Sequence, residues 1–176
     1  ETKNIYLEVI IMEKETTLPE KLKVNLLLDG WTEDQVSSQH DHLEYSFNLI
    51  GQDINIRDLA GVTVASDYSR GLASIDRGKE GLSPLDYTKN DTAEGCAKTV
   101  LVYREEKLKS YIVFRDIVVK AFCGASGNHI ATALNTIAHE CAHVELHSLI
   151  EHKMPEFLSE DKKKRRIKYC VLARGT

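Results

Sequence analysis

The segment His139-Glu140-Cys141-Ala142-His143 combines residue types that bind a metal ion with one that can accept a proton. Histidines four residues apart lie on adjacent turns of one helix face, about 6 Å apart along the axis, so both imidazoles can reach a single Zn²⁺. Glu140 is displaced by about 100° around the same helix and can reach the open side of the metal, where water binds. Zinc lowers the pKa of that water from about 16 towards 7, and a carboxylate can then take its proton. The segment therefore predicts His139 and His143 as metal ligands and Glu140 as a general base.

A catalytic zinc site has three protein ligands and an open position, so the motif leaves one ligand to be found. We choose Glu160 for its distance along the chain, and a ligand beyond Thr176, with the chain as a fragment of a longer protein, is the alternative. Glu151 and His152 are too close to the motif on the same helix, unless that helix ends early. The remaining downstream candidates are Glu156 and Asp161.

His147, His40 and His42 also lie on predicted helices. His147 continues the stripe of His139 and His143, but it lies about 12 Å along the axis from His139, so one zinc cannot bind all three on a straight helix. His40 and His42 point about 200° apart on a helix and cannot share a metal there. We interpret these two as surface histidines.

The motif lies in a predicted helix over residues 128–151, which has apolar residues at helical spacing. Upstream, Thr99–Arg104 and Ser110–Val119 are rich in β-branched residues and predict an antiparallel hairpin across the charged segment Glu105–Lys109. A second helix is expected from the N-cap Thr32 to Gly51. Shorter β-prone segments are Ile54–Ile56, Gly61–Ser66 and Leu72–Ile75, and a further apolar run is Leu22–Leu28. Two segments suit either a strand or a helix, namely Ile5–Met12, where a strand is favoured, and Ile167–Ala173.

The composition is that of an ordinary globular protein. The chain has 176 residues, 42% hydrophobic and 28% charged, with a net charge of -4, which suits one domain over residues 1–176. No apolar run approaches the roughly 20 residues that cross a bilayer. The four cysteines form no Cys-x-x-Cys pair. We expect a soluble cytoplasmic protein with reduced thiols, and two disulfides in an exported protein are the alternative.

The sequence Thr136–His147 resembles the active helix of the ImmA/IrrE-type metallopeptidases, small bacterial zincins, and the resemblance covers roughly Val100–Ile150. It implies an α+β, zincin-like fold in which a small mixed or antiparallel sheet packs on the His-Glu-x-x-His helix. It also implies a glutamate ligand on a following helix. An edge strand upstream, here Tyr111–Val119, is implied to bind the substrate in extended form.

These observations predict a zinc-dependent endopeptidase that hydrolyses a protein or peptide substrate through a metal-activated water, with a transcriptional regulator as the substrate that the resemblance suggests. Tyr87, Tyr111 and Arg115 are candidates for stabilising the oxyanion. The alternatives are an inactive zincin-fold binding or regulatory module and a metal-dependent hydrolase of a non-peptide substrate. The basic cluster Lys162–Arg166 is not expected to bind nucleic acid, because the net charge of the chain is acidic.

Overall fold

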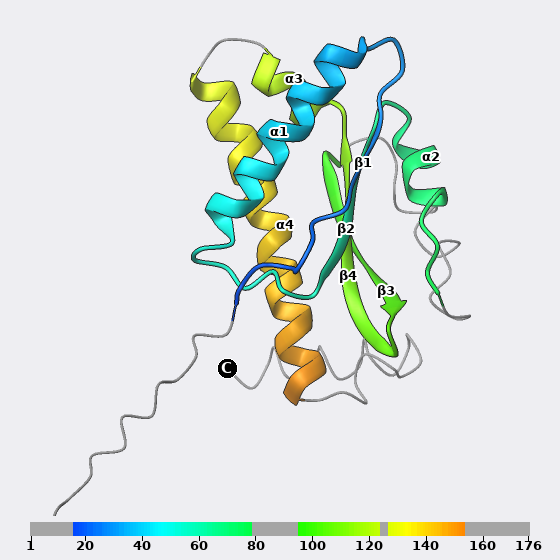
Figure 1. The fold of residues 1–176 in the computed structure, drawn as a ribbon, viewed down its shortest axis with the longest axis vertical. Coiled ribbons are helices and arrows are strands. Elements are labelled where there is room, and N and C mark those ends of the chain that lie inside the picture. The colour runs from blue at the N-terminus through cyan, green and yellow to red at the C-terminus, as the bar shows by residue number, and fades with distance from the viewer. Residues whose placement is uncertain (1–15, 79–94, 124–126, 154–176) are drawn as a thin grey trace, which may run out of the picture.

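The computed structural model describes residues 16–78, 95–123 and 127–153, which form an α+β fold with a mixed four-stranded sheet (Figure 1). The strands are β1 (Val24–Leu27), β2 (Leu59–Ala65), β3 (Ala97–Arg104) and β4 (Lys107–Arg115). The helices are α1 (Glu33–Ile50), α2 (Tyr68–Ala73), α3 (Ile117–Cys123) and α4 (Gly127–Lys153). The predicted mixed sheet beside the motif helix is therefore present.

The strand order is β1-β2-β4-β3. Strand β2 is parallel to both β1 and β4, whereas β3 pairs antiparallel with β4. The β3–β4 hairpin confirms the prediction from Thr99–Arg104 and Ser110–Val119, and only Glu105 and Glu106 separate its strands. Strands β1 and β3 are the edges of this sheet.

The prediction that Tyr111–Val119 forms an edge strand is wrong. Strand β4 lies between β2 and β3 and pairs with both of them. Its residues Ile112, Val113 and Phe114 are fully buried, as the continuous apolar run of a strand covered on both faces should be. The strand ends at Arg115, and helix α3 begins at Ile117.

The sheet separates two apolar clusters. The larger cluster lies between the sheet and α1, α3 and α4, and includes Phe47, Phe114 and Ile137. The smaller cluster packs α2 against the other face, through Leu72 and Val102 among others. Figure 1 shows the same division, with α2 on the opposite side of the strands from α1 and α4. Helix α4 therefore has one apolar face against the sheet and is free to present another.

The helix predicted from Thr32 to Gly51 is confirmed as α1. Thr32 and Gln35 form a reciprocal capping box, in which the Thr32 hydroxyl accepts from the Gln35 N–H and the Gln35 side chain accepts from the Thr32 N–H. Leu43 and Phe47 are buried from this helix against the sheet.

Two β-prone segments are not strands. Ile54–Ile56 lies in the connection between α1 and β2, and Leu72–Ile75 overlaps the end of α2. Ile5–Met12 and Ile167–Ala173 lie outside the described residues. None of the helices in the described part of the chain is long and apolar enough to cross a membrane.

Candidate metal centre

The imidazoles of His139 and His143 converge on the exposed face of α4. Their Nε2 atoms are 3.2 Å apart, and the ring planes are nearly perpendicular at 79°. Two nitrogens bound to one tetrahedral zinc at about 2.0–2.1 Å lie roughly 3.3 Å from each other. A point about 2 Å from both nitrogens therefore exists, so the residues fit a shared metal ion. The same separation also suits a hydrogen bond between two neutral rings, so metal binding stays a prediction.

The two histidines lie on the solvent-exposed face of α4 because the apolar residues of this helix pack into the core. Ile137, Cys141 and Val144 are fully buried against the sheet and α1, while His139 and His143 are exposed. The predicted helix over residues 128–151 is observed with its ends at Gly127 and Lys153.

Glu140 points towards the edge strand β3. The residue is only 6% exposed. The Thr99 hydroxyl lies 2.6 Å from Glu140 Oε2 and 3.2 Å from the main-chain oxygen of the same residue. Glu140 and His139 line one open pocket between α4 and the start of β3, together with Cys96, Ala97, Thr132, Asn135 and Thr136. The predicted base thus borders a pocket beside a predicted ligand.

His147 is held apart from the other two histidines. Its Nδ1 shares a hydrogen bond of 2.9 Å with the Ser110 hydroxyl of β4, and its ring centre lies 6.5 Å from that of His143. Burial, with a further contribution from His143, lowers the pKa of His147 to about 4. Within the described residues, His147 forms no cluster of three potential ligands with His139 and His143, in agreement with the reach argument from helix geometry.

The third ligand is not found among residues 16–78, 95–123 and 127–153. Glu160, which we choose from the sequence, lies outside the described residues, as do Glu156 and Asp161. Glu151 lies near Asp58 instead, and burial together with that carboxylate raises the pKa of Glu151.

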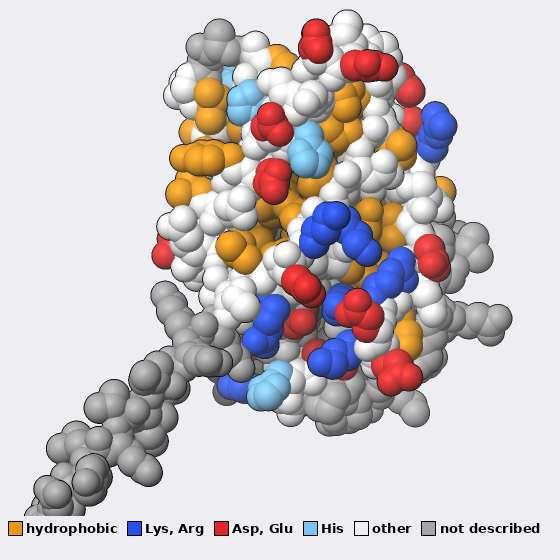
Figure 2. Space-filling view, in the orientation of Figure 1, with side chains coloured by type: hydrophobic (Ala, Val, Ile, Leu, Met, Phe, Trp, Pro, Cys, Tyr) orange, Lys and Arg blue, Asp and Glu red, His pale blue; other side chains and the backbone are white. Residues whose placement is uncertain are grey.

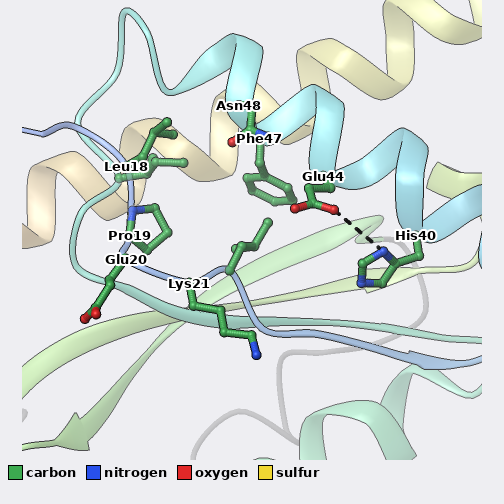
Figure 3. Close-up of a pocket in the computed structure, with 10 residues that line it drawn as sticks. Leu18, Pro19, Glu20, Lys21, His40, Glu44, Phe47 and Asn48 are labelled. Atoms are coloured by element: carbon green, nitrogen blue, oxygen red, sulfur yellow. Dashed lines mark ion pairs between the residues drawn. The ribbon is translucent and has the colours of Figure 1, made fainter.

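A second group of potential ligands lies on α1. His40 Nδ1 is 3.8 Å from Asp41 Oδ1. It is 3.9 Å from Glu44 Oε2, the pair joined by the dashed line in Figure 3. In the described part of the chain this is the one set of three such side chains close enough to hold an ion. This group was not predicted from the sequence, although a histidine and a glutamate four residues apart on a helix are a visible signal. The carboxylates are exposed to solvent, where such groups commonly hold no ion.

His42 confirms the expected divergence on α1, because its ring stacks on Phe122 of α3 with centres 5.5 Å apart. On the face drawn in Figure 2, acidic and basic side chains are interspersed. The basic cluster Lys162–Arg166 lies outside the described residues.

The prediction that Tyr111 can stabilise an oxyanion is wrong. Its hydroxyl lies 3.0 Å from Thr63 Oγ1, and its ring packs in the cluster around α2, on the sheet face away from α4. Side chains alternate between faces along a strand, so Tyr111 and its neighbour Ser110, which reaches α4, point in opposite directions. Tyr87 lies outside the described residues, and Arg115 ends β4.

Comparisons with protein-family models, with curated proteins and with solved structures give no match for this chain. The likeness of α4 to the ImmA/IrrE-type helix therefore rests on its sequence motif alone.

Proposed function

We propose that this chain is a zinc metallopeptidase of the ImmA/IrrE type, with a zincin-like fold, that hydrolyses peptide bonds in a protein substrate. The observation that carries the proposal is the convergence of His139 and His143 Nε2 to 3.2 Å on the exposed face of α4. Glu140, on the same helix, lines the pocket that His139 also lines. This arrangement supports a metal-activated water as the nucleophile.

His139 and His143 would hold the zinc ion, with the remaining ligand supplied from outside the described residues. Zinc bound there supplies a Lewis acid and lowers the pKa of water towards about 7. Glu140 accepts one proton from the attacking water, whose hydroxyl adds to the carbonyl carbon. The carboxylic acid then returns that proton to the leaving nitrogen as the C–N bond breaks. One water is consumed, and neither product is oxidised or reduced.

We assign substrate binding to the outer edge of β3 rather than to Tyr111–Val119, the segment predicted from the sequence to bind it. The N–H of Tyr103 donates away from the sheet to the Arg77 carbonyl, at 2.8 Å. Backbone direction alternates along an antiparallel strand, so Thr99 and Ala97 also present their backbone groups outwards. An extended peptide adds naturally to such an edge. This stretch borders the pocket of His139 and Glu140, which supports a substrate path across the candidate centre.

Arg77 limits this path at the far end of β3. Its main-chain oxygen accepts from the Tyr103 N–H, and its guanidinium donates to the Leu101 carbonyl at 3.1 Å. Backbone pairing with a substrate is thereby concentrated at residues 97–99, beside Glu140.

The test is cleavage of a proteome-derived peptide library by the zinc-loaded protein, with new termini identified by mass spectrometry. We expect defined cleavage by the wild type and a loss of about 10²–10⁴-fold in rate for Glu140→Gln. The amide has the same shape but cannot accept the proton, so zinc content and fold should be unchanged.

Two results would contradict the proposal. Equal cleavage by Glu140→Gln and by the wild type would remove the assigned mechanism. A zinc-loaded wild type that cleaves no peptide would favour the second candidate function, an inactive zincin-fold binding module. That candidate is favoured by one observation, namely that the described residues supply only two of three ligands at the motif.

A further inference from the structure

The protein shields the side chain of Glu140 from most of the solvent. Glu140 is 6% exposed, although it lines the pocket beside His139. A buried carboxylate needs hydrogen-bond donors, because burying a charged group without them is costly. Among the described residues, the side-chain donor to this carboxylate is the Thr99 hydroxyl, at 2.6 Å from Oε2.

The Thr99 hydroxyl has one proton and two acceptors within reach. The carboxylate oxygen is at 2.6 Å, and the main-chain oxygen of Glu140 is at 3.2 Å. Hydrogen bonds from a hydroxyl to an ionised carboxylate are typically about 2.5–2.7 Å and are stronger than those to a neutral carbonyl. The Thr99 hydroxyl therefore donates its proton to Oε2 of Glu140, the nearer acceptor.

Thr99 is itself held firmly. It lies in β3 opposite Ile112 of β4, and Ile112 is fully buried. A β-branched side chain has restricted rotation about χ1, so the position of its hydroxyl follows from the position of the strand. This hydrogen bond therefore holds the Glu140 carboxylate of α4 in a defined position relative to strand β3.

We propose that Thr99 is a positioning residue for Glu140. By occupying Oε2, its hydroxyl fixes the plane of the carboxylate and leaves Oε1 to accept the proton of the attacking water. The inference rests on the proposed function, because it assigns to Glu140 the role of base. A general base works only within hydrogen-bond reach of the proton that it takes, and a displacement of about 1 Å can cost roughly 100-fold in rate.

The test compares Thr99→Val with Thr99→Ser in the zinc-loaded protein, using a peptide that the wild type cleaves. Valine keeps the branched shape and removes the hydroxyl, whereas serine keeps the hydroxyl. We expect kcat to fall about 10- to 100-fold in Thr99→Val, with KM and bound zinc unchanged. Thr99→Ser should recover most of that loss. Adding Thr99→Val to Glu140→Gln should cause no further loss, because no base remains to be positioned.

Crystal structures of the two variants give a readout that is independent of activity. We expect the Glu140 carboxylate to keep its orientation in Thr99→Ser and to turn in Thr99→Val. If valine prevents folding, Thr99→Ala replaces it under the same criteria.

The outcomes separate this inference from the proposed function. Suppose that the wild type hydrolyses peptides. The role of Thr99 alone is then overturned if Thr99→Val is as active as the wild type, or if Thr99→Ser is as impaired as Thr99→Val. A wild type that binds no zinc and cleaves nothing overturns both. An unchanged carboxylate in the Thr99→Val crystal structure also overturns the positioning role.

Discussion

His147 is half-buried and shares a hydrogen bond with Ser110. Burial lowers its pKa from 6.5 to about 4, and the neighbouring His143 adds to this shift. As the pH falls below about 6.5, the unfolded chain takes up a proton that the folded protein does not accept until about pH 4. Burial of this ring therefore has no pH-dependent cost above about pH 6.5, and the free energy of unfolding falls progressively between pH 6.5 and about 4.

We expect the metal-free protein to lose up to about 3 kcal/mol in its free energy of unfolding over this window, at 1.36 kcal/mol per pKa unit. Urea unfolding at several pH values measures the loss. The matched control is His147→Gln, which keeps a polar group beside Ser110 but does not titrate, and its stability should depend less on pH. An identical pH dependence in the two proteins would show that His147 is not the group responsible.

The cysteines should differ sharply in reactivity. Cys141 is fully buried, and burial together with the neighbouring Glu140 raises the pKa of its thiol to about 12. Cys96 and Cys123 are exposed. Because the thiolate is the reactive form, iodoacetamide at pH 8 should modify Cys96 and Cys123 in the folded protein, and Cys141 only after unfolding. Peptide mass spectrometry measures this, and modification of Cys141 at the rate of Cys96 would contradict the burial.

At the scale of elements, the hairpin β3–β4 has an unusual turn. Glu105 and Glu106 both have positive φ, 51° and 62°, as a two-residue hairpin turn of type I′ requires. Residues other than glycine adopt this region at a cost of about 1–2 kcal/mol each. Glycine is free of that cost but gives the unfolded chain more freedom.

We therefore expect Glu106→Gly to raise the free energy of unfolding by about 0.5–1 kcal/mol. Thermal or urea unfolding measures the change. Glu106→Ala is the control, because it removes the same carboxylate and keeps the Cβ, and it should lie within about 0.5 kcal/mol of the wild type. A stability gain in Glu106→Ala equal to that in Glu106→Gly would assign the effect to charge instead of backbone conformation.

Elements with strong local signals could be predicted from the sequence. The capping residue Thr32, the periodic apolar residues of α4 and the charged break at Glu105 identify α1, α4 and the hairpin. The position of β4 in the sheet could not, because strand order depends on pairing between segments far apart in the chain. Helix α3 was missed because Ile117, Val118 and Val119 favour strands, whereas the burial of Val118 and Val119 against the other helices stabilises a helix here.

On the scale of the whole molecule, the candidate site combines one local motif with partners from distant strands. His139, Glu140 and His143 were predictable because helix geometry alone brings them together. Thr99 and Ser110 were not, since they are 41 and 37 residues away along the chain from Glu140 and His147, respectively. Only the packing of α4 on the sheet shows these contacts. The third metal ligand, for which we choose Glu160, stays a prediction.

The most direct test of the account is the zinc content of four purified proteins, measured per chain by elemental analysis after dialysis. The alternative group His40, Asp41 and Glu44 on α1 provides the control. We predict one zinc per chain in the wild type, in Glu140→Gln and in His40→Ala. His139→Ala should bind none, because a ligand belongs to the zinc site whereas Glu140 acts on the water. Zinc retained by His139→Ala, or lost from His40→Ala, would contradict a metal centre at His139 and His143.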